Sequence, residues 1–173
     1  MASKPFLHNI SAALLLALAT SPSHAQQDAR AEVVFVQPEK FTDVGDSYSP
    51  TDRQREVLLG QIKRHIEERA APHVATGHRL AISITDVDMA GGFEPWRGPR
   101  VGNIRIVRNS YPTRIVLSYR LTGAEGKLIG EGNRVLSDLA YLHNIEYRDD
   151  LLRYEKKLLD DWLEREFARP GRS

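Results

Sequence analysis

The apolar residues of the first half of the chain predict a strand, a helix and a second strand. The run 31–37 is apolar and β-branched on both faces, which is typical of a central strand. Ser49 followed by proline predicts the start of a helix that continues to about Ala70. Alternating apolar residues then predict a strand over 80–88. Because a helix joins these two strands, we expect them to run parallel with a right-handed connection.

The second half of the chain predicts a hairpin and a further strand. Segments 101–108 and 113–121 flank a four-residue turn that contains proline. Pairing Ile106 with Ile115 puts the apolar side chains of both segments on one face, which favours this register. After a glycine-containing turn, another strand is expected at about 127–136.

A final helix is expected from Asp149 or Asp150 to about Ala168, because leucine and aromatic residues repeat there at helical spacing. The resulting element order is β-α-β-β-β-β-α. This order predicts an α+β fold. It would be a two-layer sandwich, in which a mostly antiparallel sheet of about five strands carries two helices on one face.

The N-terminus has the three-part pattern of a secretory signal peptide. Lys4 precedes an apolar run over 10–20, and small residues occupy the −3 and −1 positions of a cut after Ala25. The run is too short for a stable membrane anchor. We therefore expect a signal peptide at 1–25, a single domain at 26–168 and a loose tail at 169–173.

Composition narrows the possible functions. The chain has no cysteine, which excludes cysteine nucleophiles, zinc–thiolate sites and iron–sulfur clusters. Without residues 1–25, 23 basic residues balance 23 acidic ones, since only Lys4 is lost from the 24. No nucleic-acid partner is expected from this balance, and no later stretch is apolar and long enough for a transmembrane anchor. Together with the signal pattern, this predicts a soluble periplasmic protein without a cofactor.

Five short blocks carry a resemblance to a known family. They are 35–43 (FVQPEKFTD), 86–91 (DVDMAG), 114–119 (RIVLSY), 136–141 (LSDLAY) and 154–162 (YEKKLLDDW). These blocks resemble an exported Gram-negative family known as domain of unknown function 3016. The resemblance implies a small exported domain, and it implies no activity.

The first candidate site is a group of carboxylates. Asp86 and Asp88 are two residues apart at a strand end, which places them on one face, here the face of Ile82 and Ile84. With Glu94 they offer oxygen ligands for Mg²⁺ or Ca²⁺, or one of them a general base. The alternative is that the two aspartates organise the following glycine turn. A D-x-D pattern alone does not decide between a metal site and a turn.

The second candidate is a partner-binding patch of arginines with a tryptophan. Arginine is abundant from 97 to 134, a segment that contains eight basic residues and only two acidic ones. The patch would consist of Trp96, Arg97, Arg100, Arg105, Arg114 and Arg120, the last three on the outer face of the predicted hairpin. Guanidinium groups suit phosphate or carboxylate partners, and tryptophan offers a stacking surface. The alternative is that acidic side chains of the same chain pair with these arginines.

Two functional hypotheses follow. The first is a non-catalytic binding or structural module of the cell envelope whose partner is an anionic envelope component or an acidic protein. The second is a cation-binding or hydrolytic enzyme built on Asp86, Asp88 and Glu94. The first needs arginines without acidic partners. The sequence has no zinc-binding histidine motif and no G-x-S-x-G motif. The second hypothesis therefore depends on the carboxylates alone, and it needs them to converge in a pocket.

Overall fold

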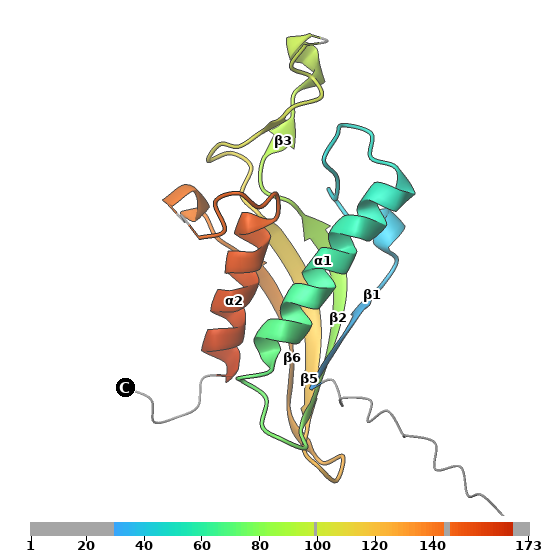
Figure 1. Cartoon of the computed structure of the whole chain (residues 1–173), viewed down its shortest axis with the longest axis vertical. Helices are drawn as coiled ribbons and strands as arrows, with labels where there is room; N and C mark the ends of the chain where they lie inside the picture. Colours follow the sequence, from blue (N-terminus) through green and yellow to red (C-terminus); the bar gives the residue numbers. More distant parts are fainter. Residues whose placement is uncertain (1–29, 99, 144–145, 168–173) are drawn as a thin grey trace, which may run out of the picture.

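A computed structural model describes residues 30–98, 100–143 and 146–167 of the chain. The predicted strands and helices follow one another in the expected order, and the described residues also form a short strand, β3, and 3-10 helices labelled η, which were not predicted (Figure 1). They are β1 (Ala31–Phe35), η1 (Pro38–Lys40), α1 (Asp52–Ala70), β2 (Arg79–Asp88), β3 (Gly92–Phe93), η2 (Pro95–Arg97), β4 (Arg105–Ile106), β5 (Arg114–Thr122), β6 (Leu128–Ser137), η3 (Tyr141–His143) and α2 (Arg153–Phe167). Residues 1–25, predicted as a signal peptide, and the tail 169–173 lie outside the described part.

The main sheet has four strands in the order β1-β2-β5-β6. β1 is parallel to β2, as the crossover through α1 predicts, and the other two pairings are antiparallel. β3 and β4 form a separate two-stranded sheet. The α+β prediction is therefore confirmed, with the expected strands divided between two sheets. The expected central position of the first strand is wrong, because β1 lies at the edge of the main sheet.

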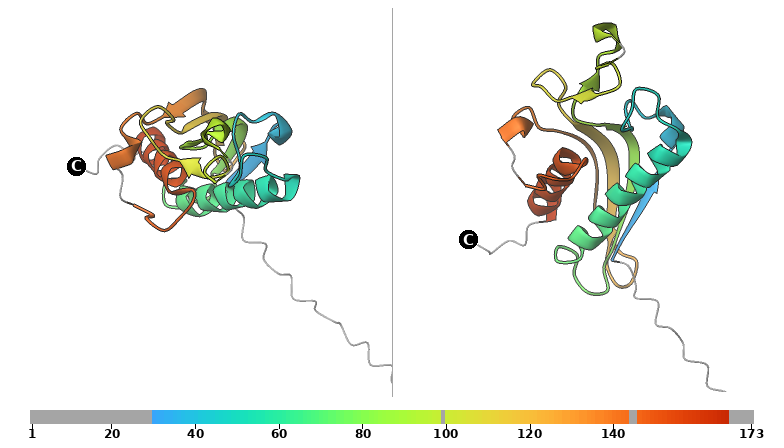
Figure 2. Two further views of the ribbon diagram at one scale, coloured as in Figure 1. Left: turned by 90° about the horizontal axis from the view of Figure 1, so that it is seen from above. Right: turned by 45° about the horizontal axis from the view of Figure 1, so that its top comes forward.

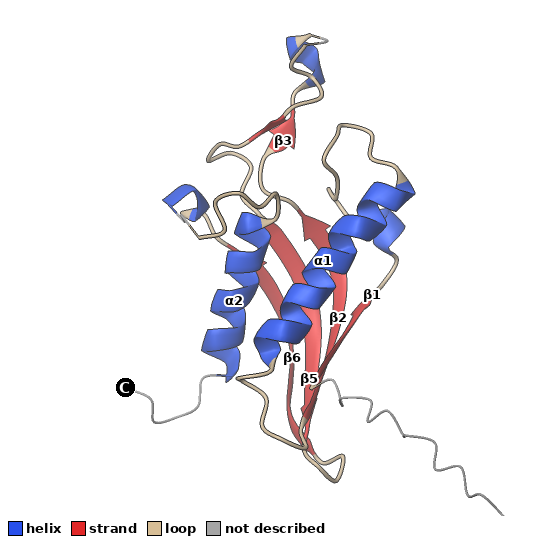
Figure 3. Ribbon diagram, in the orientation of Figure 1, coloured by secondary structure: helices blue, strands red, loops and turns tan. Residues whose placement is uncertain are grey.

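Both helices cover the same face of the main sheet (Figure 3). Ile62 and Ile66 of α1, Leu159 of α2 and Leu117 of β5 are at most 1% exposed and belong to one core. Each side chain that such a core removes from water contributes about 1.5–3 kcal/mol relative to an exposed one. Along β5, buried and less buried residues alternate, so the sheet has one covered face and one face without helices.

The two helices begin later than the sequence predicted. Thr51, not Ser49, caps α1, because its hydroxyl accepts from the Gln54 backbone N–H and the Gln54 side chain accepts from the Thr51 N–H. α2 begins at Arg153, since the Asp150 side chain accepts from the Leu152 N–H in the preceding turn. Within the described residues, no helix combines the length and apolar character that a bilayer crossing requires.

The predicted hairpin between 101–108 and 113–121 is wrong. β5 pairs on one side with β2 and on the other with β6, both ten residues long, so it has no free edge for a third strand. The segment before it turns away and forms β4, which pairs with β3. Ile115 lies opposite Val87 and Leu136 instead of Ile106.

The two-stranded sheet is the stem of a projection that we call the arm, residues 92–106. In Figures 1 and 2 it extends away from the main sheet and both helices, with η2 near its far end. Gly91 starts the arm with φ +82°, a conformation that L side chains rarely adopt. A Cβ at this position would lie 2.9 Å from the Ile106 carbonyl oxygen, so close packing also requires glycine here.

Candidate functional site

A β-bulge decides where the predicted carboxylates point. The register between β2 and β5 shifts between Ile84 and Asp86, so Thr85 is an extra residue in β2. Before the bulge, Ile82 and Ile84 point to the buried face of the sheet, and after it Val87 points to that face. The prediction that Asp86 and Asp88 continue the Ile82 face is therefore wrong, because one inserted residue moves them to the other face of the sheet.

Asp86 organises a loop. Its Oδ1 accepts from the Thr42 backbone N–H at 2.8 Å, and its Oδ2 accepts from the Thr42 hydroxyl at 3.0 Å. Oδ2 also pairs with Arg114 Nη1 at 2.8 Å. A carboxylate with these partners holds the segment after β1 against the end of β2, and it has few positions left for another ligand.

Asp88 lies in the same region with a raised pKa. Burial is the main cause, and the neighbouring negative charges of Asp43 and Asp86 raise the pKa further. Arg105 and Arg114 oppose the change. Asp88 borders a hollow of about 180 Å³ lined by Asp88, Met89, Gly91, Ser110, Tyr111, Pro112, Arg114 and Ser137. This is the main-sheet end from which the arm begins.

Glu94 has partners of its own in the arm. Its side chain is 3% exposed and pairs with Arg97 Nε at 2.6 Å and with Arg108 Nη1 at 3.1 Å. The Tyr111 hydroxyl donates to it at 3.2 Å. In the described ranges, no group of three or more His, Asp or Glu side chains is placed to hold a metal ion. The structure therefore does not assemble Asp86, Asp88 and Glu94 into one site.

Arg105 is buried at the base of the arm. Its guanidinium binds both carboxylate oxygens of Asp43, at 2.8 and 2.9 Å, and its Nη2 donates to the Gly45 carbonyl at 2.7 Å. It lies over the Phe93 ring at 4.6 Å from the centroid. Because the side chain is 8% exposed, it joins the arm to the loop 43–45 and does not belong to an outer surface.

The other two arginines of the predicted sheet patch are also paired. Arg114 binds Asp86 and Arg120 binds Glu131, at 2.8 and 2.9 Å. With Arg105 on Asp43, each of the three has an acidic partner, so the main sheet does not present them as free cations. Trp96, Arg97 and Arg100 are instead brought together in the arm, all of them exposed.

The outer end of the arm is apolar and basic. Trp96 is 73% exposed, Ile104 55% and Val101 36%. Backbone hydrogen bonds from Val101 and Gly102 to Gly98 fold this end into tight turns. Asn103 accepts from the Tyr48 N–H at 2.9 Å, which ties the arm to the loop before α1.

Sequence reasoning missed a buried carboxylate under the arm. Glu155 of α2 is 0% exposed, and its Oε1 accepts from the Ala90 N–H at 2.7 Å, one residue before the glycine pair. Burial raises its pKa, while the hydrogen bond from Ala90 and the charge of Arg105 oppose the change. The spacing contained a signal, since position 155 lies three residues after Leu152 and four before Leu159 on the buried stripe.

A second missed cluster joins the two helices. Asp160 of α2 accepts from the Tyr147 hydroxyl at 2.7 Å, and it pairs with His65 Nε2 at 2.9 Å and Arg69 Nε at 3.1 Å. Burial and the hydrogen bond to Asp160 raise the pKa of Tyr147 to about 12. The carboxylate thus satisfies three donors between α1 and α2, which is a packing role.

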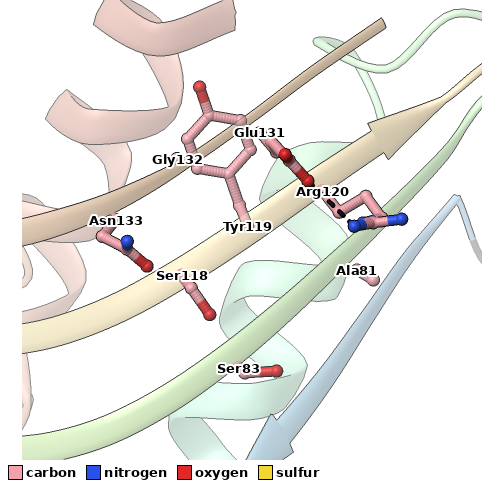
Figure 4. Close-up of a pocket in the computed structure, with 8 residues that line it drawn as sticks. All are labelled: Ala81, Ser83, Ser118, Tyr119, Arg120, Glu131, Gly132 and Asn133. Atoms are coloured by element: carbon pink, nitrogen blue, oxygen red, sulfur yellow. Dashed lines mark ion pairs between the residues drawn. The ribbon is translucent and has the colours of Figure 1, made fainter. Parts of the chain in front are cut away.

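The face of the main sheet without helices carries a wide, shallow hollow of about 660 Å³ (Figure 4). Its lining residues are Ala81, Ser83, Ser118, Tyr119, Arg120, Glu131, Gly132 and Asn133. Ser83, Ser118 and Asn133 are neighbours across three strands. No histidine, the usual base for a serine nucleophile, is among these lining residues.

Comparison with curated proteins and with solved structures gives no match. A family model described as "Protein of unknown function (DUF3016)" matches residues 29–165, which include the sheet, α1, the arm and all but the last two residues of α2. The match confirms the resemblance carried by the five sequence blocks. The chain therefore belongs to this family of unknown function.

Proposed function

We propose that this protein is a non-catalytic binding module of the cell envelope and that the arm is the part that contacts its partner. The observation that carries the proposal is the exposure of Trp96 at 73% on a projection whose base is held by buried side chains. A large aromatic side chain that stays exposed on a held segment suits recognition, since aromatic residues and arginine dominate binding energy at interfaces.

Three ion pairs, each with one buried partner, support this role. Glu94 fixes the base of η2 through Arg97 and Arg108, and Arg105 fixes β4 through Asp43. Because these contacts already order the arm, binding would cost less conformational entropy than ordering a free loop. The arm also contains Trp96, Arg97 and Arg100, which are the exposed part of the patch that the sequence suggested for an anionic partner.

The alternative enzyme has less support. A cation-dependent or hydrolytic site needs carboxylates that converge and retain free oxygen positions. Asp86 is engaged by Thr42 and Arg114, and Glu94 is engaged by Arg97 and Arg108. The open hollow on the sheet contributes no acid–base pair beyond the Arg120–Glu131 ion pair. The geometry therefore favours binding over catalysis.

The envelope location in this proposal rests on the signal pattern at 1–25. It has a direct test, which is N-terminal sequencing of the protein purified from the periplasm of a Gram-negative host. We expect the mature chain to begin at Gln26. A chain that keeps Met1 or stays in the cytoplasm would refute the envelope part of the proposal.

Photo-crosslinking tests the arm itself. A photo-reactive amino acid replaces Trp96 in one variant and Leu139 in a matched control, because Leu139 is 78% exposed but lies between β6 and η3. We expect a discrete adduct from position 96 in cells and none from position 139. Equal labelling at both positions, or no adduct from position 96, would contradict a binding role for the arm.

A further inference from the structure

The arm has an excess of positive charge. Its residues and the two that follow, 92–108, contain Arg97, Arg100, Arg105 and Arg108 but only one acid, Glu94. Asp43 neutralises Arg105 at the base. Glu94 is a single carboxylate shared by Arg97 and Arg108, so it balances one of them. Two positive charges therefore remain on the surface of the arm.

The arm also exposes three apolar side chains. η2, which contains Trp96, lies near the far end (Figure 1), and the turn that follows it contains Val101 and Ile104. All three side chains are exposed, by 73%, 36% and 55%. Arg97, next to Trp96, is 53% exposed and points back to Glu94. Tryptophan beside arginine is the combination that proteins place at a membrane–water interface.

The shape of the arm favours a surface over a small ligand. Small-molecule sites are concave and enclose most of the ligand. The arm is a projection, and neither the hollow beside Asp88 nor the one on the open sheet face includes Trp96, Val101 or Ile104. A projection that exposes apolar and basic side chains together fits a flat, negatively charged and soft surface. The surface of an anionic phospholipid bilayer has these properties.

We infer that the end of the arm binds anionic phospholipid surfaces, with the Trp96 side chain at the level of the headgroups and Arg97 and Arg100 near the lipid phosphates. This inference rests on the proposed function, since it names the chemistry of the partner that the arm contacts. Binding of this kind is peripheral and reversible. It needs no covalent lipid and no helix that crosses the bilayer.

Vesicle binding, measured by tryptophan fluorescence, tests the inference. The two tryptophans differ in exposure, so a change caused by lipid can be assigned to Trp96. Trp96 is exposed, whereas Trp162 is 2% exposed in the core. With vesicles that contain phosphatidylglycerol, we expect a blue shift of tryptophan emission and quenching by lipids brominated on their acyl chains. Both effects should disappear in Trp96→Phe. With phosphatidylcholine vesicles, or in high salt, we expect binding at least tenfold weaker.

Matched variants isolate the arm. Trp96→Ala should weaken vesicle binding at least tenfold, and Leu139→Ala should leave it unchanged. Arg100→Gln should weaken binding about fivefold, the effect of one basic residue at an anionic surface, whereas Arg120→Gln makes the same charge change on the sheet and should have no effect. Equal effects of Arg100→Gln and Arg120→Gln, or equal binding to both lipid types, would overturn the inference.

The outcomes of the two experiments are distinguishable. A protein adduct from position 96 without vesicle binding would leave the proposed binding role intact and overturn the lipid inference. Vesicle binding that depends on Trp96, together with a lipid adduct from position 96, would support both. If neither an adduct nor vesicle binding is found, both fail.

Discussion

Glu155, a buried carboxylate below the arm, makes the free energy of unfolding depend on pH. Glu155 has a raised pKa because burial disfavours its charged form. Between the ordinary pKa of 4.5 and the raised value, the folded protein binds more protons than the unfolded chain. The free energy of unfolding therefore falls as pH rises through this window, and the full cost of the buried charge is present above it.

This cost predicts the behaviour of Glu155→Gln. The amide oxygen can still accept from the Ala90 N–H but carries no charge. We expect the free energy of unfolding of Glu155→Gln, relative to wild type, to increase between pH 5 and pH 8 in urea titrations. Glu155→Ala should lose about 1–3 kcal/mol at pH 5, because the Ala90 N–H loses its acceptor, and less at pH 8, because alanine also lacks the buried charge. A Gln variant whose difference from wild type does not change with pH would show that the carboxylate carries no such cost.

Arg105 and Arg120 allow a buried ion pair to be compared with an exposed one. Arg105 uses both terminal nitrogens on Asp43 and Gly45, which a lysine cannot reproduce. We expect Arg105→Lys to lower the free energy of unfolding by about 2 kcal/mol. Arg120 and Glu131 are 62% and 52% exposed, so Arg120→Lys should cost no more than about 0.5 kcal/mol. Similar losses in chemical denaturation would contradict the structural role of Arg105.

Among single residues, sequence reasoning identified Trp96, Arg97 and Arg100 as neighbours because they are close in the chain. It did not find the partners of Arg105 or Glu94. Asp43 lies 62 residues before Arg105, and pairing over that distance depends on how the chain folds. Thr42 on Asp86, a separation of 44 residues, was hidden for the same reason.

At the scale of elements, long periodic segments were predictable and irregular ones were not. α1, β2, β5 and β6 were expected close to their observed positions, because apolar periodicity reports directly on burial. The bulge at Thr85 has no such signal, since T-D-V-D continues a plausible alternation on the wrong face. Segment 101–108, which overlaps the second half of the arm, was expected in the main sheet because pairing Ile106 with Ile115 put their apolar side chains on one face.

The turn that starts the arm gives an element-scale prediction. Gly91→Ala places a side chain at φ +82° and within 2.9 Å of the Ile106 carbonyl oxygen. We expect a loss of about 1–3 kcal/mol and a change in the Trp96 emission as the arm shifts. Gly130→Ala is the control, because its Cβ would meet nothing within 4 Å, and it should change stability by less than about 0.5 kcal/mol. If Gly91→Ala behaves like the control, the arm does not depend on this turn.

At the scale of the whole molecule, one covered and one uncovered face of the main sheet predict opposite responses at adjacent positions. Leu117 is 1% exposed under the helices, so Leu117→Ala should lower the free energy of unfolding by about 2–5 kcal/mol. Ser118 lies on the other face and borders the hollow, and Ser118→Ala should stay within about 0.5 kcal/mol. A large loss at Ser118, measured by the same denaturation, would indicate that something covers this face.

The overall architecture was predictable because it follows from the element order and the right-handed crossover. The division into two sheets was not. It depends on which segment pairs with the second edge of β5. The ten-residue strand β6 occupies that edge, so segment 101–108 cannot pair there. Local sequence patterns do not contain this competition between distant segments.

The short stem of the arm has a consequence for amide hydrogen exchange. β3 and β4 are joined by only two residue pairs, whereas β5 is paired along both edges. Amides of the stem should exchange through local opening, and those of β5 only through global unfolding. Anything that clamps the arm will therefore slow deuterium uptake at residues such as Phe93 and Arg105 while leaving β5 unchanged. Exchange measured by mass spectrometry can thus detect molecules that bind the arm, whatever their chemical class.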